Sequence, residues 1–121
     1  MLKVLVVDDS VILRKAIISL LGELGHEGIG EAGSGYEAIH EYKRLHPDLV
    51  TMDITMPGVQ GIHDGVEALK EIMKIDPEAN VIMVTSHGEE ELVLDAIDAG
   101  AKGYILKPIT KEKIETILKK F

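Results

Sequence analysis

The sequence contains no cysteine and no tryptophan, and only three tyrosines and one phenylalanine among its 121 residues. Without cysteine, disulfides, thiolate nucleophiles and zinc–thiolate centres are excluded. So few aromatic side chains leave little surface for stacking on nucleic-acid bases. Apolar residues nevertheless make up 45% of the chain, which is enough for one hydrophobic core. We therefore expect residues 1–121 to form a single domain.

Long apolar runs are also missing, and none approaches the roughly 20 residues that a membrane-spanning helix requires. Residues 1–7 lead directly into acidic residues without a cleavage-site pattern, so they are not a signal peptide. Positive charge is scarce as well, since 21 acidic and 13 basic residues give a formal net charge of −8. Such a surface repels phosphate backbones. We expect a cytoplasmic protein that binds neither nucleic acid nor membrane, and whose partner is a protein or a divalent cation.

Short apolar runs alternate with amphipathic segments along the whole chain. The runs are typical of parallel strands covered on both faces, and the segments have helical spacing. The apolar runs predict strands at 2–7, 49–52, 81–84 and 104–106, and a weaker strand is expected at 28–32. The predicted helices are 11–24, 36–45, 66–75, 89–99 and 110–121. Five strand–helix units joined by right-handed crossovers predict a doubly wound (βα)5 α/β fold, with a five-stranded parallel sheet between helices on both faces.

Charged and hydroxyl side chains follow or end four of these strands. They are Asp8 and Asp9 after the first strand, Asp53 after the third, Thr85 after the fourth and Lys107 after the fifth. The carboxyl ends of parallel strands share one sheet edge, where ligands bind, so we expect these side chains to converge. Three acids in one pocket repel one another, and a divalent cation with oxygen ligands relieves that repulsion. Mg²⁺ is the expected ion, because it leaves positions open for water and phosphate oxygens.

Taken one at a time, the same residues have purely structural explanations. The acids after the first strand can cap the following helix. Asp53 can be a turn residue ahead of Pro57, and Lys107 can be an ordinary surface lysine. The coincidence of acids, hydroxyl and ammonium at one predicted edge is what favours a functional site.

Four ordered motifs carry a resemblance to a known family. They cover residues 6–10, 47–57, 84–86 and 100–108, and read VVDDS, PDLVTMDITMP, VTS and GAKGYILKP. In this order and spacing, over essentially the whole chain, the sequence resembles the receiver domain of two-component response regulators. Within that family it is most similar to the stand-alone CheY-like chemotaxis regulators. The resemblance implies a flavodoxin-like fold and a switch that acts by binding other proteins.

The resemblance also assigns roles to the acidic residues. It implies that Asp53 is the nucleophile that takes a phosphoryl group from a phosphohistidine of a partner histidine kinase. Asp9 and Asp53 are implied to bind Mg²⁺ directly, Asp8 through water, and Thr55 through its backbone carbonyl. Catalysis is then limited to phosphorylation and dephosphorylation of Asp53 itself, and the protein is not an enzyme with an external substrate.

Two further roles follow from the same resemblance. Lys107, ahead of a cis bond to Pro108, is implied to pair with one phosphoryl oxygen, and the Thr85 hydroxyl with another. On phosphorylation Thr85 is implied to move inward and Tyr104 to follow it, which changes a surface on the last two helices and last strand. Because the chain ends after the fifth helix, we expect the target, such as a motor or adaptor, to be a separate protein. The residues alone also allow Tyr104 to be a half-buried aromatic that never moves.

One segment departs from the family pattern. The helix entry expected soon after Pro57 is found at residues 64–67, four residues late. The extra residues are most simply 58–61, as a longer loop, because Gly58 and Gly61 disfavour helix; the alternative is an added helical turn at 62–65. The insertion is either a tolerated surface loop, or it changes metal access, partner fit or phosphoryl lifetime.

Other functions fit parts of the pattern. A phosphorelay intermediate would use the same residues, and the sequence does not separate it from a chemotaxis regulator. An aspartyl-nucleophile, Mg²⁺-dependent phosphatase would use Asp53, but it requires a second acid where Thr55 stands and a cap for which 121 residues leave little room. A receiver that only docks would not need the acids, hydroxyl and lysine that are all present.

Overall fold

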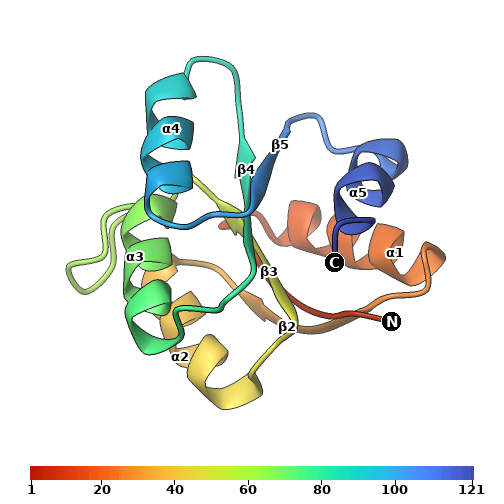
Figure 1. The fold of residues 1–121 in the computed structure, drawn as a ribbon, viewed down its shortest axis with the longest axis horizontal. Coiled ribbons are helices and arrows are strands. Elements are labelled where there is room, and N and C mark those ends of the chain that lie inside the picture. Colours follow the sequence, from red (N-terminus) through yellow and green to blue (C-terminus); the bar gives the residue numbers. More distant parts are fainter.

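The structure is a computed structural model that describes residues 1–121. Five strands alternate with five helices along the chain (Figure 1). The strands are β1 (Lys3–Val7), β2 (Glu27–Ala32), β3 (Leu49–Asp53), β4 (Val81–Thr85) and β5 (Gly103–Leu106). The helices are α1 (Val11–Glu23), α2 (Gly35–Leu45), α3 (Gly65–Ile75), α4 (Glu90–Asp98) and α5 (Lys111–Leu118). Every predicted element is present, with ends displaced by at most three residues.

The five strands form one parallel sheet in the order β2-β1-β3-β4-β5. This order confirms the predicted doubly wound fold and places the topological switch point between β1 and β3. Val7 pairs with Met52, and Asp53 pairs with Val84. This register brings the carboxyl ends of β1, β3 and β4 out at the same edge of the sheet.

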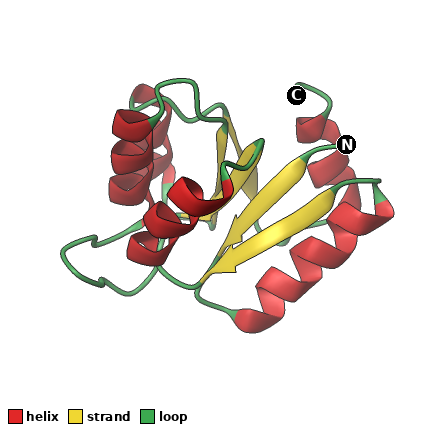
Figure 2. Ribbon diagram, turned by 90° about the horizontal axis from the view of Figure 1, so that it is seen from below, coloured by secondary structure: helices red, strands yellow, loops and turns green.

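Helices cover both faces of the sheet. α1 and α5 lie on one face, and α2, α3 and α4 lie on the other (Figures 1 and 2). Along β1, Val4 and Val6 pack in the core under α1 and α5, whereas Leu5 and Val7 pack in the core under the other three helices. All four side chains are buried. Because successive side chains of a strand point to opposite faces, a continuous apolar run is what a doubly covered strand requires.

Side-chain caps fix where the helices start. Ser10, Ser34, Asp64 and Thr110 each accept a hydrogen bond from a backbone N–H three residues further on. Replacing such a cap by alanine typically costs about 1 kcal/mol of stability. The cap of α1 is Ser10, so neither Asp8 nor Asp9 is the N-cap residue of this helix. None of the five helices has the length and apolar character needed to cross a bilayer.

The connection from β3 to α3 contains the four extra residues. Helix α3 begins at Gly65 after the Asp64 cap, and residues 62–64 are not helical. The interpretation as a longer loop is therefore confirmed, and the alternative of an added helical turn is wrong. The loop projects beside α3 in Figure 1.

The tip of this loop is an ordered turn. Val59 and Ile62 exchange backbone hydrogen bonds, each with an N–O distance of 3.0 Å. Between them Gln60 and Gly61 have φ values of 49° and 82°. Two consecutive left-handed residues are typical of the tightest hairpin turns, and glycine adopts this conformation without steric cost.

Candidate functional site

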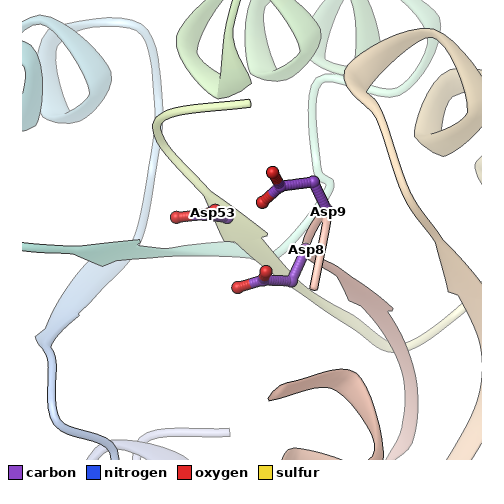
Figure 3. Close-up of side chains that lie close together, drawn as sticks. All are labelled: Asp8, Asp9 and Asp53. Atoms are coloured by element: carbon purple, nitrogen blue, oxygen red, sulfur yellow. The ribbon is translucent and has the colours of Figure 1, made fainter. Parts of the chain in front are cut away.

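Three carboxylates meet at the switch point of the sheet. Asp8 and Asp9 follow β1, and Asp53 ends β3, so residues far apart in sequence come together (Figure 3). One carboxylate oxygen from each lies within 4.8 Å of those of the other two. Asp8 and Asp53 are only 1% and 4% exposed, whereas Asp9 is exposed. Two acids therefore form the floor of the cluster, and the third faces solvent, from which an ion would enter.

The protein donates a hydrogen bond to only one of the two carboxylate oxygens of Asp8. Its Oδ1 accepts a hydrogen bond from the N–H of Ser10 at 2.8 Å. Its Oδ2 is buried and has no hydrogen-bond partner. A buried carboxylate oxygen without a donor is unfavourable, and native structures contain few of them. An all-oxygen cluster with such an atom fits a hard divalent cation.

Lys107 supplies the single cation of the cluster. It follows β5, and its bond to Pro108 is cis, as the family resemblance implied. Its Nζ lies 3.3 Å from Asp53 Oδ1 and 3.6 Å from Asp8 Oδ2. Burial on its own would lower the pKa of Lys107, but the charges of Asp53 and Asp8 outweigh burial and raise it. One ammonium facing three carboxylates leaves negative charge uncompensated, which is the condition that attracts a cation.

The same crowding acts on Asp53. Burial raises the pKa of Asp53 to about 6, with a further contribution from the charge of Asp8 and a small one from Asp9; Lys107 opposes the shift. In the protein alone, Asp53 is therefore partly protonated near pH 6. A cation bound between the acids would favour the ionised form and reverse this shift.

The hydroxyl of Thr85 forms its hydrogen bond with Glu89 and not with the three clustered aspartates. Thr85 is buried at the end of β4, and its Oγ1 donates to Oε1 of Glu89 at 3.0 Å. The same oxygen accepts from the N–H of Ser86 at 2.6 Å, and the other carboxylate oxygen accepts from the Thr55 hydroxyl. Burial would raise the pKa of Glu89, but these three donors, together with the charge of Lys107, lower it. Glu89 is therefore a carboxylate held by three donors beside the acidic cluster.

Thr55 and Tyr104 are the remaining predicted site residues. Thr55 lies two residues beyond Asp53 in an exposed loop, and metal binding through its carbonyl stays a prediction. Tyr104 lies on β5 with 53% of its surface exposed, so it points outward in this structure. Open hollows lie on both sides of it, one over α5 and one toward α4. An inward movement of Tyr104 also stays a prediction.

Three residues that support the site were not identified from the sequence. Arg14 donates from Nη1 to the carbonyl oxygen of Asp8 at 2.6 Å, which fixes the turn that carries the first two acids. Gly65 lies so close beneath β3 that an added Cβ would be 2.1 Å from the carbonyl oxygen of Asp53. Glu89 was identified from the sequence only as the first residue of the predicted helix 89–99. The arginine lies one helical turn after the Ser10 cap, which is the single signal that could have indicated a contact.

Comparisons with known proteins agree with this geometry. The response regulator receiver domain family matches residues 4–119. The chemotaxis protein CheY of Thermotoga maritima is 45% identical over 118 residues, covering 98% of this chain and 95% of the relative. CheY of Bacillus subtilis is 45% identical over 112 residues, covering 93% and 90%. Among solved structures, the CheX–CheY–BeF3–Mg²⁺ complex of Borrelia burgdorferi has a TM-score of 0.89 and 38% identity, over 98% of this chain and 87% of that one.

Family, fold and site together establish what kind of protein this is. Receiver domains bind Mg²⁺ in an acidic pocket, and this chain has three acids placed where such a pocket is expected. CheY-like receivers act as regulators and are not classical enzymes. The chain belongs to the response regulator receiver domain family, is homologous to the CheY chemotaxis regulators, and functions as a two-component response regulator.

Proposed function

We propose that Asp53 is the phosphoacceptor and that Asp8, Asp9 and Asp53 hold the Mg²⁺ ion needed for its phosphorylation. The single observation that carries this proposal is the meeting of three carboxylates and one ammonium at the switch point of the sheet. Asp53 lies at the centre of this arrangement, in contact with Lys107 and within reach of both other acids. The Oδ2 of Asp8 supports a bound cation, because it is buried, accepts no hydrogen bond, and has only a 3.6 Å ion pair with Lys107.

The proposed reaction begins with ionised Asp53. One of its carboxylate oxygens attacks the phosphorus of a phosphohistidine; the P–N bond breaks, and the imidazole nitrogen keeps the electron pair and takes up a proton. Mg²⁺, when bound, neutralises charge on the phosphoryl oxygens and on the acids. Lys107 is placed to neutralise another phosphoryl oxygen, because its Nζ is already 3.3 Å from Asp53 Oδ1. Alignment and charge neutralisation are the main requirements of phosphoryl transfer.

Thr85 links the reaction to the rest of the molecule in this proposal. In the structure its hydroxyl donates a hydrogen bond to the carboxylate of Glu89. To contact a phosphoryl group on Asp53, the hydroxyl must leave Glu89 and turn toward the neighbouring strand end. The hollow beside Tyr104 is lined in part by Thr85, so an inward turn of Tyr104 is the proposed second step. The surface of α4, β5 and α5 then changes shape.

The proposed partners are a histidine kinase as phosphodonor and a separate target protein that binds this surface. The relatives named CheY favour chemotaxis, in which the target is a motor or adaptor protein. A place in a phosphorelay is the alternative, because a receiver in a relay uses the same residues. The CheY of Borrelia burgdorferi was solved in complex with CheX, which supports a protein partner for this chain as well. The proposed location is the cytoplasm, where ATP-dependent kinases are phosphorylated.

Incubation with acetyl phosphate and Mg²⁺, followed by intact-mass measurement, tests this function. We expect one phosphoryl adduct on the wild type, none on Asp53→Asn, and none when Mg²⁺ is removed by chelation. Asp98→Asn is the matched control, since it removes the same charge from an exposed position at the end of α4. An adduct on Asp53→Asn equal to that of the wild type would contradict the assignment. Rapid turnover of many phosphate esters would favour a phosphatase instead.

A further inference from the structure

The carboxylate of Glu89 lies at a point where three hydrogen-bond donors converge. They are the Thr85 hydroxyl, the Ser86 N–H and the Thr55 hydroxyl. The donors come from two different strand ends, because Thr55 follows β3 and Thr85 ends β4. A group of donors that converges from two strand ends of this edge is an anion-binding arrangement. In this structure the anion is a side chain of the protein.

The local backbone explains how Glu89 reaches this position. Gly88 has a φ of 92°, a left-handed conformation that reverses the chain just before α4. Glu89 is the N-cap residue of α4, yet its side chain makes no hydrogen bond to that helix. It turns back toward the end of β4 instead. The position that would normally supply a helix cap therefore places a carboxylate against the phosphorylation site.

We propose that Glu89 is a positioning residue that takes the place of a phosphoryl oxygen in the unphosphorylated protein and competes with the incoming phosphoryl group for Thr85 and the Ser86 N–H. This inference rests on the proposed function of Asp53. A hydroxyl has one hydrogen to donate, so Thr85 cannot donate a full hydrogen bond to Glu89 and to a phosphoryl oxygen at the same time. Phosphorylation must therefore displace the Glu89 carboxylate.

The displacement has a consequence for α4. Glu89 is the residue directly before this helix, so its side chain connects the start of α4 to the ends of both β3 and β4. Release of the carboxylate removes that connection. The site and the helix are then coupled by a side chain that has two alternative partners, solvent or the three donors. Such a two-state element is what a switch requires.

Binding of beryllium fluoride in the presence of Mg²⁺ tests the inference, because it presents a phosphoryl-like anion without chemistry. We expect Glu89→Ala to bind about three- to tenfold more tightly than the wild type, as expected for removal of one competing hydrogen-bonded anion. Glu89→Asp keeps the charge but shortens the reach, so it should also bind more tightly than the wild type. Glu90→Ala removes a charge from the first turn of α4 and should change the affinity by less than about twofold.

The affinity for Mg²⁺ alone and the direction of the change in beryllium fluoride binding separate this role from others. The affinity for Mg²⁺ alone should stay within about twofold in Glu89→Ala, because Glu89 is not among the clustered acids. If Glu89 were only a structural brace, its removal would weaken binding of beryllium fluoride. Weaker binding by Glu89→Ala and Glu89→Asp, or equal gains in Glu89→Ala and Glu90→Ala, would overturn the inference. Failure of the wild type to bind beryllium fluoride with Mg²⁺ would instead overturn the proposed function of Asp53.

Discussion

Acidic residues have different hydrogen-bond partners at the two edges of the sheet. At the amino edge, Asp48 accepts a hydrogen bond from the N–H of Lys3 at 2.8 Å. Asp76, nearby, accepts one from the Tyr42 hydroxyl at 2.8 Å, and this bond helps to lower the pKa of Asp76. Each of these acids therefore has a donor from another segment: Asp48, just before β3, is joined to β1, and Asp76, at the end of α3, is joined to α2. At the amino edge, the acidic residues therefore hold segments of the fold together.

At the carboxyl edge the acids face each other instead. Asp8 has a buried oxygen that accepts no hydrogen bond, and burial together with neighbouring charge raises the pKa of Asp53 to about 6. Lys107 is the one cation that contacts them. This difference is not explained by the stability of the protein alone, and it supports the proposal that this edge binds a cation and a phosphoryl group. Functional sites are where such local conflicts are expected.

Of all the substitutions, replacing one lysine at each edge should give the largest difference between the two edges. Lys107→Met should slow phosphorylation by acetyl phosphate roughly a hundredfold, because it removes a charge aimed at the phosphoryl group. Lys102→Met, a substitution of an exposed lysine at the amino edge, should leave the rate unchanged. Rates of adduct formation measured by intact mass check both. Similar rates for the two variants would mean that Lys107 has no special role.

Removing the charge of Asp53 should stabilise the protein when Mg²⁺ is absent. The folded-state pKa of about 6 lies above the ordinary aspartate pKa of 3.8, so the folded state holds the proton more tightly than the unfolded state. Stability then falls as pH rises from about 4 to 6, and the full penalty remains above that range. At pH 7.5 we expect Asp53→Asn to be about 2 kcal/mol more stable than the wild type, with the gap closing near pH 4.

Urea unfolding in chelator-containing buffer at several pH values measures this difference. Asp98→Asn serves as the control, because this acid is exposed at the end of α4. A gap between Asp53→Asn and the wild type that does not depend on pH would show that ionisation of Asp53 is not its cause.

At the amino edge the same kind of substitution should have the opposite sign. Tyr42→Phe removes the hydroxyl that donates to Asp76 and should destabilise the protein by about 1 kcal/mol. Because the residue lies far from the strand ends that carry the acids, binding of Mg²⁺ should not change. Urea unfolding together with Mg²⁺ titration tests both expectations. A stabilised Tyr42→Phe variant would remove the contrast between the edges.

The smallest expected effect concerns the loop between β3 and α3. Deleting residues 58–61 removes the projecting turn, and we expect the dephosphorylation rate of Asp53 to change by about threefold, which corresponds to well under 1 kcal/mol in the barrier. The loop follows the acceptor strand and precedes Gly65, which packs against Asp53, so we expect its length to influence access to the site. An unchanged rate would leave the insertion as a tolerated surface loop.

The fold could be predicted almost completely from local patterns. Four of the five strands carry an apolar run and the helices have helical periodicity. Strand β2, which reads EGIGEA and is weaker, was still placed to within one residue. The end of α5 was less accurate: it was expected to reach Phe121, but the helix ends at Leu118. Chain ends carry no following signal that would mark the boundary.

The site was predicted in part, for a physical reason. Strand topology brings strand ends together, so acids and a lysine at those ends can be found by their positions along the sequence. The roles of Arg14 and Glu89 depend on where a side chain turns after a helix start or a glycine bend. No periodicity in the sequence encodes such a turn. Residues at strand ends were therefore found, and residues that support the site from the starts of helices were missed.

Titration of the protein with Mg²⁺ is the most direct test of whether Asp8, Asp9 and Asp53 together form one cation site. We expect Mg²⁺ to raise the free energy of unfolding of the wild type, and at least about tenfold more Mg²⁺ to be needed for the same gain in Asp9→Asn. The control Asp98→Asn should respond as the wild type does. Equal responses of the wild type and Asp9→Asn, or no response of the wild type at all, would contradict the account.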